Sequence, residues 1–466
     1  MNDRTAVPAV DAPLVGRACD GHESPAEASN GGEGAVRRGT AANSTGLLRP
    51  ESGPRRADAF EAEACSRIRD VTLAPVVAPV PPPAASSEQD GAPAAPAVAE
   101  FFAGIGLARL GLERANLKVV WANDMSSDKR DMYNGHFADE HDHYQLGDIK
   151  KIAEDESAPG LPRDLDLAWA SFPCTDLSLA GGRKGLAGKH SGTFWDFTKI
   201  LENLGESDRP AVVALENVNG FATSHGGADL RAAVQELNRL GYSLDVLTLD
   251  ARSWVPQSRP RLFLVGARHA PVEEDPESRN AFLRPSWLDP VFDDEDLRTH
   301  RAALPSPPSH RVEGWTTLIE KNDPVPDDVW WDEQRQRKFE EQLSEIQLQR
   351  IAQLKEKGST VYRTAYRRTR GGKPAWEIRA DDIAGCLRTT GGGSSKQAVV
   401  EIGPKGLRTR WMTAHEYACL MGADDYTLPA RTNQALMGFG DAVCVDAVAW
   451  LAEHYLKPLI AEQKSR

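Results

Sequence analysis

The sequence is poor in cysteine, and its cysteines are not spaced as pairs. Only 6 occur among 466 residues, and neighbouring cysteines are at least 25 positions apart. They are Cys19, Cys65, Cys174, Cys386, Cys419 and Cys444. This spacing excludes a zinc ribbon and a disulfide framework, so each thiol is first expected to be a reduced, buried, small apolar group.

Long apolar runs are also missing. The uninterrupted apolar stretches are a few residues long, far short of the roughly 20 that a membrane-spanning helix needs. The chain starts with polar, Pro- and Gly-rich sequence that lacks the apolar core of a secretion signal. We therefore expect a cytoplasmic protein without a membrane span.

Positive charge is in short supply. Lys and Arg number 55 against 68 Asp and Glu, which gives a net charge of −13. This balance argues against binding to nucleic acid through bulk positive charge, so any such contact must use a local patch. The phosphate-loop pattern G-x-x-x-x-G-K-[ST] is absent as well, which disfavours ATP hydrolysis.

The composition changes abruptly near residue 98. Residues 1–97 are dominated by Ala, Pro, Gly, Ser and Arg and cannot bury enough apolar surface to offset the entropy of ordering, which predicts a disordered tail. Across 98–268, apolar strands alternate with helical stretches, which predicts an α/β domain. The expected strands are 98–102, 118–122, 165–172, 211–215 and 261–265.

Residues 269–403 lack this alternation. They are rich in Pro, Asp and Trp and contain a charged helical run at 330–357, which predicts an inserted, irregular domain. Residues 404–466 regain the earlier pattern, with helices expected near 413–421 and 443–456. This last segment is expected to return to the first domain.

Glycines and carboxylates follow the first expected strands. In an open α/β sheet the ligand crevice lies beyond the carboxyl ends of the strands. Phe102, Gly104 and Gly106 lie there, and the glycines allow a ligand to approach the backbone at a helix N-terminus. Asp124 follows about 20 residues later, a spacing suited to ribose hydroxyls, and Asp148 is placed to meet an adenine amine. The pattern predicts an adenosine-containing cofactor.

One cysteine departs from the apolar expectation. Cys174 follows the third strand, behind Pro173, at the ligand edge of the sheet. A thiolate at such a position is a strong nucleophile if nearby cations or a helix terminus lower its pKa. The loop 181–192 that comes next is rich in glycine and basic residues, which is typical of a mobile lid.

Four further polar positions lie at strand ends. Glu216 ends the fourth strand, where a carboxyl group can give or take a proton. Gln257, Arg259 and Arg261 alternate at the start of the fifth strand and therefore share one face. Polar groups at the start of a buried strand are costly unless they meet a ligand or a partner.

In this order and spacing, the motifs closely resemble the DNA (cytosine-5)-methyltransferase family over most of 98–456. The resemblance implies a Rossmann-like, S-adenosylmethionine-dependent methyltransferase sheet, with 98–268 as the catalytic domain and 269–403 as the target-recognition domain. The motifs are Phe102-x-Gly104-x-Gly106, Pro173-Cys174, Glu216-Asn217-Val218, Gln257-x-Arg259-x-Arg261 and Gly440-Asp441-Ala442-Val443.

The resemblance also implies the chemistry. Cys174 is expected to add to carbon 6 of a cytosine, and Glu216 to protonate or hydrogen-bond ring nitrogen 3. Arg261 is expected to contact the ring oxygen, with Arg259 in support. Because stacking blocks the faces of a paired base, the target base must flip out of the helix.

The family also implies a cofactor pocket for S-adenosylmethionine, with no metal. Phe102 would lie against the adenine, the backbone of the glycine loop would hold the methionine part, and Asp124 would take the ribose. The full set of expected cofactor residues is Phe102, Gly104, Ile105, Gly106, Asp124, Met125, Asp148, Ile149, Pro173, Phe194, Asp441, Ala442 and Val443.

The sequence departs from the family pattern at three places. Thr175 replaces the usual Gln after Pro-Cys, Pro260 replaces an acidic residue, and Asp441 replaces the customary Asn of the last motif. None of these changes removes a catalytic group. Asp441 alters the hydrogen bonding expected beside the cofactor, because a carboxylate cannot donate as an amide does.

A local basic patch is expected in the target-recognition domain, where residues 388–392 also resemble a segment that organises this domain. Aromatic residues are interleaved with the patch, which we call the basic strip and expect to face DNA, although a solvated basic face is the alternative. The basic strip comprises Arg363, Arg367, Arg368, Arg370, Lys373 and Arg379.

The sequence therefore predicts a bacterial enzyme that methylates cytosine in double-stranded DNA, alone or beside a cognate restriction endonuclease. We expect a monomer located in the cytoplasm with the nucleoid. Two alternatives remain open at this point. One is a tRNA cytosine-5 methyltransferase on the same scaffold, and the other is a catalytically silent DNA-binding relative.

Overall fold

The computed structural model describes residues 94–137, 143–158, 160–174, 176, 185–188, 190–275, 282–321, 325–389, 396–404 and 406–466. The tail expected over 1–97 therefore lies almost wholly outside the described residues. So do residues 181–184 and 189 of the expected lid at 181–192, residue Thr175, and residues 390–392 of the segment 388–392.

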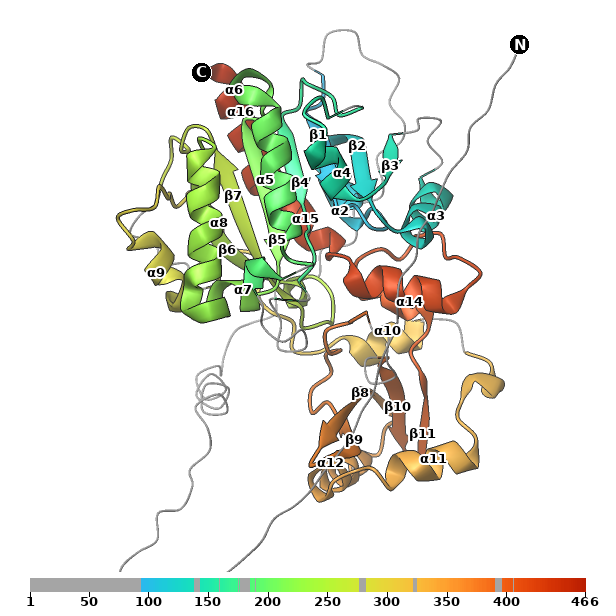
Figure 1. Cartoon of the computed structure of the whole chain (residues 1–466). Coiled ribbons are helices and arrows are strands. Elements are labelled where there is room, and N and C mark those ends of the chain that lie inside the picture. The colour runs from blue at the N-terminus through green and yellow to red at the C-terminus, as the bar shows by residue number, and fades with distance from the viewer. Residues whose placement is uncertain are drawn as a thin grey trace, which may run out of the picture. The chain divides into compact units, whose positions relative to one another are not determined.

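A seven-stranded mixed sheet forms the centre of the first domain (Figure 1). Its strand order is β3-β2-β1-β4-β5-β7-β6, and only β7 runs antiparallel to its neighbours. This arrangement confirms the expected Rossmann-like α/β class. The strands are β1 (Ala97–Phe101), β2 (Lys118–Asp124), β3 (Tyr144–Leu146), β4 (Leu167–Ala170), β5 (Val212–Asn217), β6 (Ser243–Asp250) and β7 (Pro260–Ala267).

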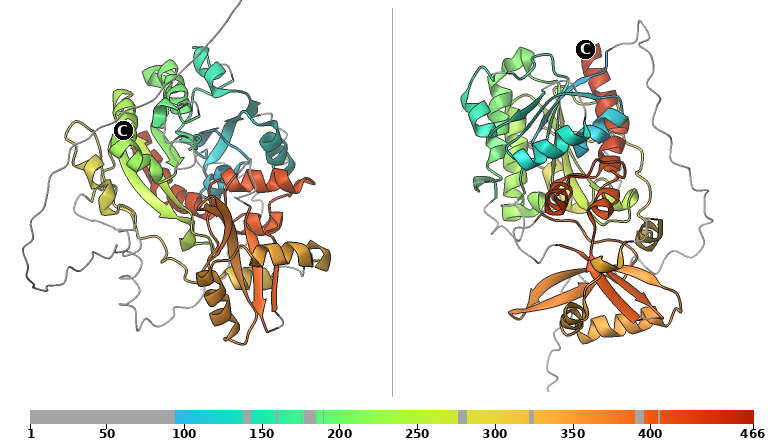
Figure 2. Two further views of the ribbon diagram at one scale, coloured as in Figure 1. Left: turned by 60° about the horizontal axis from the view of Figure 1, so that its bottom comes forward. Right: turned by 90° about the vertical axis from the view of Figure 1, so that its right-hand side faces the viewer.

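Helices cover both faces of this sheet, as the two views in Figure 2 show. The central strands are apolar on both sides because each face is buried, one against α5 and α8 and the other against α2 and the C-terminal helix α15 (Val445–Leu451). The helices of this part are α2 (Leu107–Arg114), α3 (Ser127–His136), α4 (Ile149–Glu154), α5 (Thr193–Asn203), α6 (Gly205–Asp208), α7 (Gly220–Thr223) and α8 (Ala228–Arg239).

Two strands of this sheet were not expected from the sequence. β3 is only three residues long, and the apolar pattern of β6 is interrupted by a buried carboxylate, Asp245. Asp245 accepts hydrogen bonds from Arg284 Nε at 2.9 Å and from the Tyr455 hydroxyl at 3.1 Å. These partners satisfy a buried charge that would otherwise break an apolar strand pattern.

The segment expected to be irregular contains a four-stranded antiparallel sheet of order β11-β10-β8-β9. The β8 and β9 hairpin turns at Gly371 and Gly372, whose φ angles of 55° and 77° are those of a two-residue hairpin turn. The expected boundary at residue 403 falls between the last two strands. The strands are β8 (Val361–Arg370), β9 (Lys373–Ile378), β10 (Ala398–Gly403) and β11 (Gly406–Trp411).

The remaining helices belong to the inserted segment and to the C-terminus. α11 and α12 pack on the second sheet around an aromatic group that includes Trp331, Phe339, Trp376 and Trp411. The helices are α9 (Asp289–Phe292), α10 (Trp315–Lys321), α11 (Glu333–Glu340), α12 (Glu345–Lys355), α13 (Ala414–Cys419), α14 (Thr432–Asp441), α15 (Val445–Leu451) and α16 (Lys457–Ser465).

The C-terminal helices return to the first sheet. α15 packs so closely on α2 that a Cβ at Gly111 would lie 2.6 Å from the Cβ of Val448. Helical residues 432–465 are long and apolar enough to cross a membrane by length and composition alone, but 72% of their most apolar window is buried inside the protein. This burial accounts for their apolar character as core packing.

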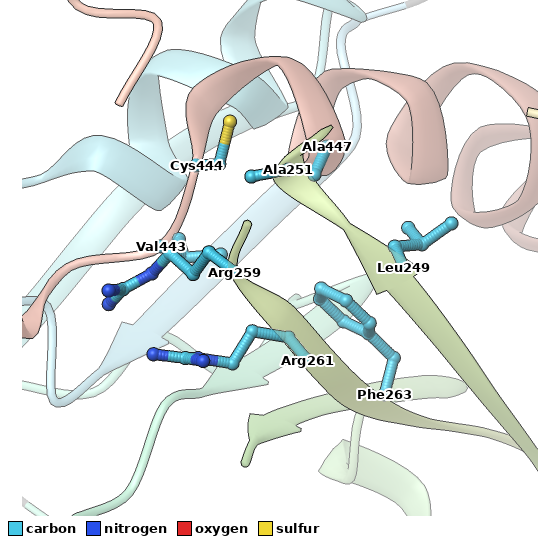
Figure 3. A pocket seen from close by; sticks show the side chains of 8 residues that line it. All are labelled: Leu249, Ala251, Arg259, Arg261, Phe263, Val443, Cys444 and Ala447. Carbon is cyan, nitrogen blue, oxygen red and sulfur yellow. The ribbon is translucent and has the colours of Figure 1, made fainter. Parts of the chain in front are cut away.

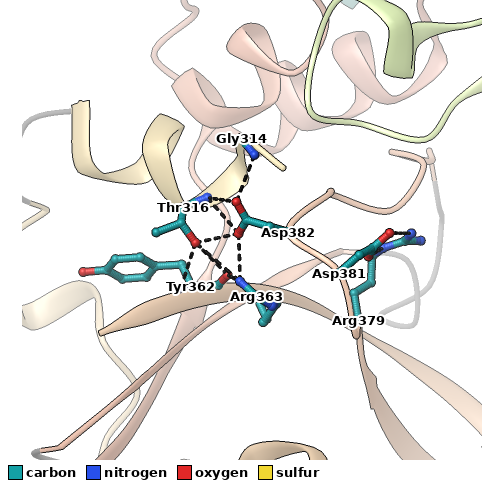
Figure 4. Close-up of polar contacts among 7 residues, drawn as sticks. All are labelled: Gly314, Thr316, Tyr362, Arg363, Arg379, Asp381 and Asp382. Carbon is teal, nitrogen blue, oxygen red and sulfur yellow. Dashed lines mark hydrogen bonds and ion pairs between the residues drawn. The ribbon is translucent and has the colours of Figure 1, made fainter. Parts of the chain in front are cut away.

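Asp382 joins the second sheet to α10 (Figure 4). Its carboxylate accepts hydrogen bonds from Gly314 N at 2.9 Å, from the Thr316 hydroxyl at 2.6 Å and from Arg363 Nη1 at 2.8 Å. The side chain of Arg363 is only 7% exposed. A charge buried to this degree destabilises the folded protein unless an opposite charge compensates it.

We predict that Asp382→Ala lowers the free energy of unfolding by about 3 kcal/mol, because it leaves Arg363 buried without its carboxylate. Urea unfolding followed by tryptophan fluorescence measures the change. The neighbouring Asp381→Ala is the control, since the Asp381 and Arg379 side chains are 32% and 25% exposed. It should cost no more than about 1 kcal/mol, and equal losses in the two variants would contradict the assignment.

Candidate active site

The loop between β1 and α2 has the geometry of a ligand-binding turn. Phe102, Gly104 and Gly106 all have positive φ, of 58°, 59° and 80°. A positive φ is uncommon for a residue with a side chain, so Phe102 is held in this conformation by its surroundings. A Cβ at Gly106 would lie 2.4 Å from the Phe137 ring, so only glycine fits there.

The end of β2 fixes this loop. Gly104 N donates to Asp124 Oδ2 at 3.1 Å, and Ala103 N donates to Asn123 O at 2.8 Å. The Tyr144 hydroxyl donates to Gly104 O at 3.1 Å. The structure thus brings together the glycines and the carboxylate that the sequence placed about 20 residues apart.

The other expected adenosine contacts lie at the ends of β2 and β3. Gly147 N donates to Asp124 O at 3.1 Å, which holds the start of α4 beside the end of β2. Asp148 is the N-cap of α4 and accepts a hydrogen bond from Lys150 N, while Ile149 behind it is buried. Met125 is 74% exposed and is free to cover a ligand.

The last motif reaches the same place from the C-terminus. Ile105 packs under α14, where a Cβ at Gly438 would lie 2.8 Å from its side chain. Asp441 Oδ2 lies 2.6 Å from Lys129 Nζ, and the same ammonium lies 3.8 Å from Asp124 Oδ2. Sequence reasoning missed Lys129, because nothing in its local pattern links it to a residue 312 positions away.

Cys174 lies just beyond the end of β4 and is half-buried. Asn217 Nδ2 donates to Phe172 O at 3.0 Å, and the Ser191 hydroxyl donates to Pro173 O at 2.8 Å, so the backbone before the cysteine is held on both sides. Burial raises the pKa of the Cys174 thiol, and the Arg261 guanidinium opposes this effect.

The antiparallel β7 explains how Arg261 meets Glu216. Glu216 on β5 is directly opposite Phe263 on β7, so Arg261 is its diagonal neighbour on the same face. Arg261 Nε lies 2.9 Å from Glu216 Oε1, and the two side chains are only 14% and 10% exposed. Burial disfavours the charge on Arg261, but the surrounding Cys386, Glu216 and Cys174 groups raise its pKa overall.

Arg259 holds backbone carbonyls from two distant segments. Its Nη1 donates to Leu387 O at 2.8 Å, and its Nη2 donates to Gly440 O at 3.2 Å and to Ala442 O. The side chain is 2% exposed, so the carbonyls take the place of water around a buried charge. Figure 3 shows the Arg259 and Arg261 guanidinium groups pointing the same way, with Val443 beside them.

Two further predicted site residues, Gln257 and Phe194, are buried in the packing around the site. Gln257 is fully buried, accepts from Leu387 N at 3.0 Å and donates to Leu420 O at 2.5 Å. Phe194 is fully buried in α5, where it contacts Phe172. Both therefore shape the site from behind.

Cys386 is a second cysteine at this site that the sequence did not reveal. Its Sγ lies 3.4 Å from Arg259 Nη1. Burial works against the thiolate, but Arg259 and Arg261 lower the pKa of Cys386 overall. The expected reduced apolar thiol thus lies beside two guanidinium groups, because only the folded chain brings Cys386 to Arg259 and Arg261.

The basic strip is not an open face throughout. Arg363 is buried against Asp382, and Arg368 and Arg370 both pair with Glu377 on the adjacent strand, at 3.1 Å and 2.5 Å. The expectation that Arg363 faces DNA is therefore wrong. The exposed positions are Arg368, Arg370 and Lys373, at the tip of the β8 and β9 hairpin.

Taken together, the sheet order, the glycine loop after β1 and the carboxylate after β2 define a Rossmann-like methyltransferase fold. A model of the family described as C-5 cytosine-specific DNA methylase matches residues 97–457. The chain belongs to this family.

Curated relatives carry similar sequences. The type II methyltransferase M.HhaI of Haemophilus parahaemolyticus is 30% identical over 171 residues, which cover 36% of this chain and 48% of the relative. M.BsuFI of Bacillus subtilis is 34% identical, over 36% and 38% of the two chains. Against these relatives the match spans half of their length or less. M.HpaII of Haemophilus parainfluenzae is 24% identical over 77% of this chain and 89% of its own.

The fold also matches a solved structure. The Dnmt2 methyltransferase of S. pombe superposes with a TM-score of 0.51 at 18% identity, covering 79% of this chain and 99% of the other. At this identity the likeness establishes the fold alone.

Glu100 is a buried carboxyl group on β1, the strand that leads into the glycine loop, and its protonation can be tested. It lies on β1, two residues before Phe102, and is 1% exposed. Burial raises the pKa of Glu100 to about 8, and the charge of Arg109 opposes that rise. The folded protein therefore holds this proton more tightly than the unfolded chain, in which the carboxyl titrates near 4.5.

Wild-type stability should consequently fall, relative to Glu100→Gln, as the pH rises from about 5 to about 8, by at most roughly 1.4 kcal/mol per pH unit. Urea unfolding of the two proteins at several pH values measures the difference. A difference that stays constant over this range would show that Glu100 is charged in the folded protein.

Proposed function

We propose that the protein transfers the methyl group of S-adenosylmethionine to carbon 5 of cytosine, at a specific site in double-stranded DNA. The observation that carries the proposal is the placement of Cys174, Glu216 and Arg261 at neighbouring ends of β4, β5 and β7. Family membership supports the same reaction.

The residues beside this triad fit the cofactor. The backbone of Gly104 is open, since a Cβ there would meet nothing nearer than 3.9 Å. Asp124 accepts from two backbone amides, and its oxygens keep lone pairs for ribose hydroxyls. Asp124 would hold the ribose, Phe102 and Met125 would border the adenine, and S-adenosylmethionine, when bound, supplies the methyl group.

Each protein group then has a defined task. The Cys174 thiolate forms a bond to carbon 6 of the flipped cytosine, which moves electron density to carbon 5 and makes it a nucleophile. Glu216 hydrogen-bonds or protonates ring nitrogen 3, offsetting the charge that develops there. Arg261 holds Glu216 in place and contacts the ring oxygen. Carbon 5 then takes up the methyl group that S-adenosylmethionine would supply. Loss of the carbon 5 proton to solvent re-forms the double bond between carbons 5 and 6 and expels the Cys174 thiolate.

Arg259 holds the backbone at 387 and in the last motif in this proposal and does not touch the base. Its guanidinium donates hydrogen bonds to the backbone carbonyls of residues 387, 440 and 442. We infer that it is a positioning residue, in agreement with the supporting role expected from the family.

The inserted domain is the proposed DNA-recognition element. The exposed part of the basic strip at the β8 and β9 hairpin supplies a local positive surface despite the net charge of −13. We further propose a monomer that works in the bacterial cytoplasm at the nucleoid, as a solitary enzyme or beside a cognate restriction endonuclease. The similarity to the type II methyltransferases M.HhaI, M.BsuFI and M.HpaII supports this setting.

We predict that Cys174→Ala lowers methyl transfer to DNA by at least about a thousandfold, because the covalent step is lost. The assay incubates the protein with methyl-labelled S-adenosylmethionine and unmethylated duplex DNA of mixed sequence, with total tRNA in parallel, and locates the label on cytosine carbon 5. Cys419→Ala is the matched control, since Cys419 is buried in α13 and contacts His415 instead. It should retain activity within about twofold.

The outcomes separate the alternatives. Label in DNA that disappears only in Cys174→Ala supports the proposal. Label in tRNA alone would assign the chain to RNA methylation. Label in neither nucleic acid would favour a silent relative or a DNA site missing from the mixture. Repeating the assay with unmodified genomic DNA as the substrate distinguishes these two cases, because a silent relative would label that DNA no better.

A further inference from the structure

Lys129 occupies an unusual position at the edge of the cofactor pocket. It lies in the first turn of α3, where Ser126 caps the helix. Its Nζ lies 2.6 Å from Asp441 Oδ2 and 3.8 Å from Asp124 Oδ2. The Lys129 side chain is 25% exposed and that of Asp441 is 47% exposed, so both can be reached from solvent.

The aliphatic part of Lys129 passes over the glycine loop. Its Cδ is the nearest atom to the position of a Cβ on Gly104, at 3.9 Å. The Lys129–Asp441 pair therefore joins the last motif to α3 beside Asp124, the proposed ribose ligand.

Lys129 remains charged in these surroundings. Burial disfavours the ammonium, but Asp441 and Asp124 together raise the pKa of Lys129 above its ordinary value. The three groups carry one net negative charge. S-adenosylmethionine carries one net positive charge, from a sulfonium, an α-ammonium and a carboxylate, so the two sets are complementary.

A neighbouring cation and anion match the amino-acid end of the cofactor group by group. An ammonium on the protein can take the cofactor's carboxylate, and a carboxylate on the protein can take its α-ammonium. An amide at position 441 would supply one donor and one acceptor from a single side chain. Here Asp441 only accepts, and Lys129 provides the missing donor.

We propose that Lys129 and Asp441 together bind the amino-acid end of S-adenosylmethionine, Lys129 taking the carboxylate and Asp441 the α-ammonium. Lys129 thereby becomes a further cofactor-binding residue, and Asp441 is a functional departure from the family's Asn. This assignment depends on the proposed function only in that the site binds this cofactor.

The test compares two ligands by isothermal titration calorimetry of the full-length protein. S-adenosylhomocysteine carries the amino-acid end, whereas 5′-methylthioadenosine lacks it and keeps the adenosine. Lys129→Met and Asp441→Ala should each weaken S-adenosylhomocysteine binding by about tenfold to a hundredfold, the size of a lost charge-assisted contact. Both variants should bind 5′-methylthioadenosine within about twofold of wild type.

Arg431→Ala is the matched control. Arg431 Nη2 lies 2.6 Å from Asp128 Oδ1, so this pair also joins α14 to α3 but lies on the surface. The control variant should bind both ligands like wild type. The fold-loss of S-adenosylhomocysteine affinity in the double variant K129M/D441A should be smaller than the product of the fold-losses in the two single variants, because the two residues bind one zwitterion.

Three results would overturn the assignment. Unchanged or tighter binding of S-adenosylhomocysteine by Lys129→Met would show that the pair competes with the cofactor. If the variants bound S-adenosylhomocysteine and 5′-methylthioadenosine more weakly by the same factor, the pair would only shape the pocket. If the wild-type protein bound neither ligand, the assignment of S-adenosylmethionine as the cofactor would be wrong, and the proposed function would be wrong with it.

Discussion

The buried guanidinium of Arg259 is the contact on which the site depends. It is located where β7 begins, and it binds the carbonyls of Leu387, Gly440 and Ala442. One carbonyl belongs to the inserted segment and the other two belong to the last motif, and these two parts of the chain are far apart in the sequence. Gly440 permits the approach, because a Cβ there would lie 2.7 Å from the backbone of Arg388.

The two halves of the site meet at that last motif. On one side, Gly440 and Ala442 bind Arg259, which stands next to Arg261 and, through it, Glu216. On the other side, Asp441 binds Lys129 above the glycine loop. Residues 440–443 therefore connect Arg259 to Lys129 and the glycine loop. In the proposed function, this short segment sets the distance between methyl donor and acceptor.

Much of this arrangement could be predicted from the sequence. The carboxyl ends of parallel strands meet at one edge of a sheet, so Gly104, Asp124, Cys174 and Glu216 were expected to be neighbours once the strands were located. Arg261 follows from the same reasoning, with the antiparallel β7 supplying its exact partner. These positions are governed by local pattern and by sheet geometry.

The rest depends on contacts between distant segments, which leave no local pattern. Lys129 meets Asp441, and Cys386 meets Arg259, only because the inserted and C-terminal segments fold back on the first sheet. Arg363 looked like part of a DNA-facing strip, but Asp382 buries it. β6 was missed because its buried Asp245 is satisfied by Arg284 and Tyr455, residues that are remote in sequence.

Hydrogen exchange measured by mass spectrometry in Arg259→Met tests the central claim most directly, namely that this one guanidinium holds both segments to the catalytic sheet. The account predicts faster amide exchange in peptides that cover 386–389 and 440–443, with unchanged exchange in peptides that cover 102–106 and 123–126. Unchanged protection of the first two segments would contradict it, because the site would then be assembled without Arg259.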